Sequence, residues 1–108
     1  MDIEALRNYI LQKPGVTEGF PFGEDTLVFK VKEKIFLLTG LDSSPLQFNV
    51  KCDPGKAIEL REEYPQNILP GYHMNKKHWN TVIVDGSVSN KLLKEMIDDS
   101  YQLVSKKK

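Results

Sequence analysis

The chain has 108 residues, with 15 basic and 15 acidic side chains, so its formal net charge at pH 7 is zero. This length predicts a single domain over residues 1–108 that buries roughly two-thirds of its unfolded surface. Zero net charge excludes nucleic-acid binding through overall charge and leaves only local clusters of Lys and Arg for that purpose.

Two further features bear on where the protein works. No apolar run approaches the roughly 20 residues needed to cross a bilayer, and the acidic, amphipathic start is unlike a secretory signal. The one cysteine, Cys52, cannot form an internal disulfide. A chain of this kind suits a reducing compartment, so we expect a cytoplasmic protein without a membrane partner.

The N-terminal segment has the pattern of an amphipathic helix. Asp2 can cap its start, and Pro14-Gly15 ends it. The buried stripe is formed by Ile3, Leu6 and Ile10. The residues that follow are predicted to be extended but irregular, with Phe20 and Phe22 filling the core.

The middle of the chain alternates in the manner of β-strands. Thr26–Lys32 places apolar residues on one side and lysines on the other, and Glu33-Lys34 predicts a tight reversal. Ile35–Thr39 is apolar on both faces, which favours a central position in a sheet. Leu46–Lys51 alternates again and predicts a third strand with one wet face.

The second half predicts two helices around one more strand. Asp53-Pro54 is a typical helix start, and the helix is expected to reach about Tyr64 and to bury Ala57, Ile58 and Leu60. Pro65–Gly71 is predicted to be a connector, and Thr81–Val84 is predicted to be the fourth full strand. Ser89 is the expected N-cap of the last helix, with a buried stripe of Leu93, Met96, Ile97, Tyr101 and Val104.

These elements predict an α+β fold. Consecutive strands joined by short turns favour an antiparallel sheet, covered by the N- and C-terminal helices plus the one intervening helix.

The most distinctive stretch is H-M-N-K-K-H-W-N-T-V-I-V-D-G, which starts at His73 and ends at Gly86. Together with K-P-G, F-P-F-G, K-C-D-P-G and D-D-S-Y-Q-L-V elsewhere, it resembles the signature of the MmcQ/YjbR family of small bacterial proteins. The resemblance covers nearly the whole chain. It implies a frataxin/CyaY-like α-β-α arrangement and DNA binding.

The residues themselves also allow a nucleic-acid surface. Lysines and His78 offer phosphate donors, Asn75 can bond a base edge, and Tyr72, His73 and Trp79 offer stacking faces. The predicted contacts, chiefly to DNA phosphate, come from a lysine-bearing hairpin and a loop: Lys30, Lys32, Lys34, His73, Asn75, Lys76, Lys77, His78 and Trp79. Local patches on a neutral protein predict weak, salt-sensitive binding.

Three alternatives remain open at this point. His73, Asn75 and His78 could instead form a structural network that holds the connector, leaving a non-enzymatic module that binds another protein. Metal binding by His73 and His78, with Cys52 and Asp53, lacks a recognisable third ligand at zinc spacing. The acidic ridge by which frataxins bind iron is also missing, so we expect no metal and no cofactor.

Catalysis has equally little support in the sequence. Cys52 sits where a helix N-terminus could lower its pKa, and Ser43 or Ser44 could pair with a histidine. However, a buried structural cysteine is the commoner outcome, and neither a Gly-rich phosphate loop nor paired catalytic carboxylates occur. We therefore expect no catalytic residues and no enzyme.

Overall fold

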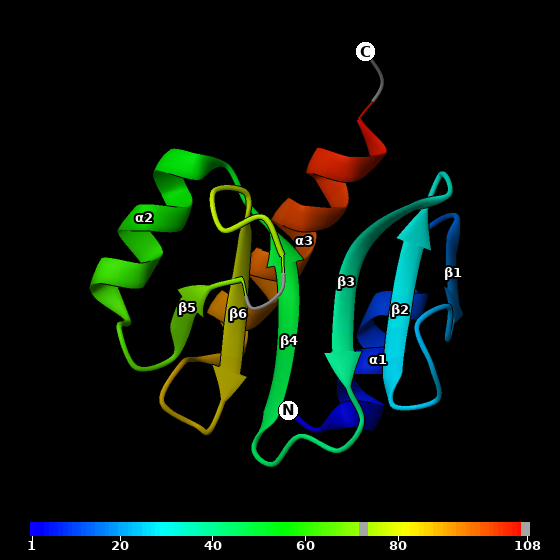
Figure 1. Ribbon diagram of the computed structural model, residues 1–108, viewed down its shortest axis with the longest axis horizontal. Helices are drawn as coiled ribbons and strands as arrows, with labels where there is room; N and C mark the ends of the chain where they lie inside the picture. Colours follow the sequence, from blue (N-terminus) through cyan, green and yellow to red (C-terminus); the bar gives the residue numbers. More distant parts are fainter. Residues whose placement is uncertain (72–73, 107–108) are drawn as a thin grey trace.

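The computed structural model describes residues 1–71 and 74–106, which form a six-stranded antiparallel sheet and three helices (Figure 1). In chain order the elements are α1 (Ile3–Leu11), β1 (Val16–Gly19), β2 (Thr26–Val31), β3 (Lys34–Gly40), β4 (Leu46–Lys51), α2 (Pro54–Glu63), β5 (Ile68–Pro70), β6 (Trp79–Val84) and α3 (Asn90–Ser105). The strands lie in the order β1-β2-β3-β4-β6-β5. The predicted α+β class is confirmed.

Helices cover only one face of this sheet. In Figure 1, α1 and α3 lie behind the strands, and α2 lies beside β5 at one edge. The core is between the helices and the sheet, where apolar side chains from alternate strand positions are fully buried: Phe29, Leu37, Phe48, Ile68 and Val82. We call the opposite side the uncovered face.

Each helix begins at the residue that the sequence predicts. Asp2 accepts a hydrogen bond from the Ala5 amide (2.8 Å), and Ser89 accepts one from the Leu92 amide (3.1 Å). Asp53 accepts bonds from two amides in the first turn of α2. None of the helices within residues 1–71 and 74–106 is long and apolar enough to span a membrane.

The sheet has two strands more than the four full strands predicted. β1 pairs with β2 in the segment predicted to be merely extended, and β5 pairs with β6 in the segment predicted to be a connector. Both are edge strands of three or four residues, too short to show alternation. Ile68 in β5 is nonetheless fully buried opposite Val82, so this connector contributes to the core.

The hairpin reversal is one residue earlier than predicted. Lys32 and Glu33 form the turn, with φ angles of 52° and 64°, and Lys34 already belongs to β3. Two consecutive residues in the left-handed region match the twist of a two-residue hairpin turn. The prediction that β3 is central is confirmed, since it lies between β2 and β4.

Three apolar residues predicted to be buried are exposed. Phe20 and Phe22 are 50% and 65% exposed in the loop between β1 and β2, and Ile58 is 53% exposed on α2. The loop lies beyond the ends of the strands, where the core is already filled. Ile58 lies on the outer side of α2 because Ala57 and Leu60 face the core.

Candidate functional site

The uncovered face carries lysines but no carboxylate at its strand positions. The alternate residues of β2, β4 and β6 on this face are Thr26, Val28 and Lys30; Gln47, Asn49 and Lys51; and Trp79, Thr81 and Ile83. The helices carry seven of the 15 acidic residues, including Glu59, Glu62 and Glu63 on α2 and Glu95, Asp98 and Asp99 on α3, together with five basic residues. The strand positions of the uncovered face thus carry only positive charge, whereas the helices carry both signs with an excess of two negative charges.

The register places the two lysines at the same level of the sheet. Phe29, Leu37 and Val50 form one row across β2, β3 and β4. Lys30 and Lys51 each follow that row by one residue in strands that run in the same direction. Beyond this row the register of β2 shifts, and β3 and β4 are no longer paired, because the Ser100 hydroxyl bridges the Lys51 amide and the Phe36 carbonyl. We call Lys30 and Lys51 the lysine row, and Trp79 continues it because it pairs with Lys51.

The loop before β6 closes on itself through Asn75. The Asn75 side chain accepts a bond from the Lys77 amide (2.9 Å), and its backbone carbonyl accepts bonds from the amides of His78 (3.2 Å) and Trp79 (3.0 Å). The His78 carbonyl in turn accepts a bond from the Cys52 amide (2.7 Å). These bonds give Asn75 a structural role within the loop, and Lys77 is exposed on the resulting turn.

Arg61 fixes this loop from α2, and sequence reasoning missed it. Its Nε donates to the side-chain oxygen of Asn80 (2.7 Å), and its Nη2 donates to the carbonyls of Trp79 (3.2 Å) and Lys76. Asn80 is only 1% exposed, so its carbonyl oxygen needs such a partner. The only signal in the sequence was an arginine in the last turn of a helix, which is common and unspecific.

The predicted hairpin lysines do not share one side. Lys30 faces the uncovered side, but Lys32 lies in the turn and its Nζ donates to the Ser105 carbonyl at the end of α3 (2.7 Å). Lys34 pairs with Val31, a core residue on the helix side. The prediction of one lysine-lined side is therefore wrong, because the turn changes the alternation after Val31.

The other predicted residues divide into three groups. Lys76 and Lys77 lie on the loop, where the Lys76 Nζ is 3.5 Å from the Gly71 carbonyl. Trp79 is half-buried at the start of β6. Tyr72 and His73 lie outside the described residues.

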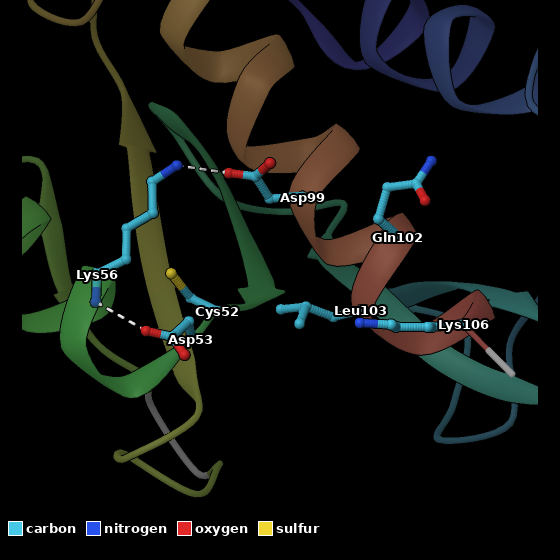
Figure 2. Close-up of a pocket in the computed structure, with 7 residues that line it drawn as sticks. All are labelled: Cys52, Asp53, Lys56, Asp99, Gln102, Leu103 and Lys106. Carbon is cyan, nitrogen blue, oxygen red and sulfur yellow. Dashed lines mark hydrogen bonds and ion pairs between the residues drawn. The ribbon is translucent and has the colours of Figure 1, made fainter. Parts of the chain in front are cut away.

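A cleft lies between the start of α2 and the end of α3 (Figure 2). Its volume is about 410 Å³, and it is lined by Cys52, Asp53, Lys56, Asp99, Gln102, Leu103 and Lys106. Lys56 and Asp99 form an ion pair across it at 2.8 Å. Each charged group of this pair therefore already has a partner of opposite charge.

The Cys52 thiol in this cleft is not activated. Cys52 is only 7% exposed, and this burial raises the pKa of its thiol, with Lys56 opposing the shift and Asp99 and Asp53 adding to it. A raised thiol pKa leaves little thiolate at neutral pH. The shift of the thiol pKa is thus opposite to the lowering considered from the sequence. As for metals, the part of the chain that the structure describes holds no cluster of three or more His, Cys, Asp or Glu suited to an ion.

Comparison with known proteins identifies the family. The family model described as YjbR matches residues 11–103. The chain belongs to the YjbR family. It is 41% identical to protein YbdF of Escherichia coli O157:H7, over 94% of this chain and 82% of that protein. It is 29% identical to protein YjbR of Escherichia coli K12, over 94% of this chain and 86% of that protein.

Solved structures of similar proteins share the fold. The crystal structure of the Deinococcus radiodurans protein DR2400 superposes with a TM-score of 0.93 at 46% identity, over 97% of this chain and 79% of that one. A crystal structure of a Pseudomonas syringae protein gives a TM-score of 0.77 at 26% identity, over 96% and 99%. The six-stranded sheet with one uncovered face is thus the architecture of this YjbR family member.

Proposed function

We propose that the protein binds nucleic acid through the uncovered face of its sheet. The phosphates lie along the lysine row of Lys30 and Lys51, and the exposed Lys77 and neighbouring Lys76 extend the contact from the loop. Because Arg61 and Asn75 hold this loop, its lysines need little ordering when they bind.

The absence of carboxylates from the strands of the uncovered face carries this proposal. A phosphate backbone approaching this face meets lysines and no carboxylate from its strands, whereas the helices present seven carboxylates among five basic residues. Local electrostatics therefore orient a polyanion toward one side of the protein even though its net charge is zero. Few phosphate contacts imply weak binding that falls steeply with salt.

The test measures anisotropy of a short labelled oligonucleotide at several salt concentrations. Replacing Lys30 and Lys51 together by Ala should weaken binding and lower the magnitude of the salt slope by about one for each lost contact. The matched control replaces Lys91 and Lys94 of α3 by Ala, an equal change of charge on the opposite side. Equal losses in both variants, or no binding of any oligonucleotide at low salt, would contradict the proposal.

A second candidate, a protein-binding module, is favoured by one observation. Phe20 and Phe22 are half or more exposed in the same loop, which is unusual for large aromatic side chains. If a protein is the natural partner, cross-linking followed by mass spectrometry should place its contacts at residues 19–25. The Phe20→Ala/Phe22→Ala variant should then lose the cross-links, and the lysine variant should keep them.

A further inference from the structure

The uncovered face is hollowed beside the lysine row by a groove of about 530 Å³. The residues that line it are uncharged: Phe22, Thr26, Leu38, Thr39, Gly40, Ser43, Gln47, Asn49, Met74 and Thr81. Its floor is formed by β3, β4 and β6. Phe22 comes from the loop before β2, and Met74 comes from the loop before β6, so the groove is bordered on two sides. This volume is within the range of small-ligand sites, about 300–1,000 Å³.

The polar groups that line the groove include the side-chain amides of Gln47 and Asn49. Asn49 accepts a bond from the Thr81 hydroxyl (2.5 Å) at its side-chain oxygen, which fixes the amide and directs its NH₂ group elsewhere. Gln47 lies two residues before Asn49 on the same face of β4. The Thr39 hydroxyl donates to the Gln47 backbone carbonyl (2.7 Å), so this bond does not use the Gln47 side-chain amide. Side-chain amides present a donor and an acceptor side by side, which matches the edge of a nucleobase.

The groove also has an aromatic surface that the core does not use. Phe22 is 65% exposed although it lines the groove, so its ring is available to a ligand. An exposed aromatic ring is the usual platform on which a base stacks. Asn49 and Lys51 are separated by one residue of β4, about 7 Å along the strand, so a base at Asn49 and its phosphate at Lys51 fit one nucleotide.

We propose that this groove receives an unpaired nucleobase of a single-stranded nucleic acid, while the lysine row holds the adjoining phosphates. This inference rests on the proposed function and specifies its ligand. A base in a duplex is stacked on both faces and its pairing edge is occupied, so it cannot both stack on Phe22 and bond Gln47 or Asn49. The protein therefore prefers single strands to duplexes.

The chain provides a matched pair of variants for the test. Phe22→Ala removes the proposed stacking platform. Phe20→Ala is its control, because Phe20 is also half exposed in the same loop but lines a different cleft with Ile3 and Arg7 of α1. Asn49→Ala removes an amide from the groove, and Lys91→Ala on α3 serves as its distant control.

The experiment measures anisotropy with labelled oligothymidylate, oligoadenylate and a duplex of the same length, at low and near-physiological salt. We expect single strands to bind more tightly, Phe22→Ala to weaken their binding about tenfold or more, and Phe20→Ala to leave it unchanged. Asn49→Ala should weaken single-strand binding and spare duplex binding. Circular dichroism and thermal melting confirm that each variant is folded.

Two outcomes would overturn the inference, and they can be told apart. If duplex and single strands bind equally and Phe22→Ala has no effect, while the Lys30→Ala/Lys51→Ala variant is weakened, the base groove is wrong but phosphate binding stands. If none of the oligonucleotides binds at low salt, both the groove and the proposed function are wrong.

Discussion

The two faces of the sheet use the same strands for different purposes. On the helix side, Phe48 and Val50 are at most 2% exposed, and α1 is joined to α3 because Asp98 accepts bonds from Tyr9 (2.6 Å) and Lys13. Burial and the bond to Asp98 raise the pKa of Tyr9 to about 12. On the uncovered side, the alternate residues of the same strand, β4, are two amides and a lysine: Gln47, Asn49 and Lys51.

This difference teaches where stability and recognition are located. The free energy of folding comes chiefly from apolar burial, which is concentrated on the helix side. Half-buried polar side chains on the uncovered side, such as Gln47, can therefore vary with little cost to the fold, unlike Val28 and Leu38, which are at most 8% exposed there. The comparison predicts that neighbouring residues of one strand respond to mutation in different ways.

The largest effect is expected from a truncation in the core. Phe48→Ala should lower the free energy of unfolding by about 3–5 kcal/mol, because Phe48 is fully buried and leaves a cavity. Its neighbour Gln47 faces the other side, and Gln47→Ala should change the free energy of unfolding by less than about 1 kcal/mol. Urea denaturation measures both. Equal losses would show that the two faces do not differ in this way.

The next effect concerns the link between α2 and the loop before β6. Arg61→Ala should lower the free energy of unfolding by about 2–3 kcal/mol. The substitution removes hydrogen bonds from a charged donor and leaves the buried side-chain oxygen of Asn80 without that donor. Hydrogen exchange of the Trp79 amide should also become faster as the loop opens. Arg7→Ala is the control, since its ion pair with Glu18 is exposed. A loop that keeps slow exchange in Arg61→Ala would contradict the role of Arg61.

A smaller effect is expected where the loop passes close to Trp79. A Cβ at Gly71 would be 2.7 Å from the Trp79 Cβ and 3.0 Å from its carbonyl oxygen. Gly71→Ala should therefore lower the free energy of unfolding by about 1–3 kcal/mol and shift the fluorescence of the single tryptophan. At Gly19, on β1, a Cβ would meet no atom within 4 Å, so Gly19→Ala should leave that fluorescence unchanged. Identical spectra for wild type and Gly71→Ala would disprove the close contact.

The smallest effect is the pH dependence of the ion pair between α1 and β1. Hydrogen bonds from Arg7 hold the pKa of Glu18 below its ordinary value of 4.5, although partial burial opposes the shift. A lowered pKa means that the stabilisation is complete above about pH 4.5 and is lost as the pH falls through the lowered value. On acidification, the melting temperature of the wild type should fall by a few degrees more than that of Glu18→Gln. Equal losses would show that the pair contributes nothing.

The sequence predicted the elements whose signals are local. Asp2, Asp53 and Ser89 cap their helices because a side-chain oxygen reaches amides only a few residues away. β2 and β4 were likewise predicted from alternation within a few residues. β3 was predicted, and placed centrally, from a short run that is apolar on both faces, so the fold class was predictable.

Only the tertiary structure decided which side each residue serves. The turn at Lys32–Glu33 separated Lys32 from Lys30, because the alternation ends with the strand. Phe22 lines a groove rather than the core, since that groove is assembled from four strands and loops distant in sequence. Arg61 reaches Lys76 and Trp79 only after α2 has packed beside β5. Local patterns determine elements, whereas a surface depends on register and packing between distant segments.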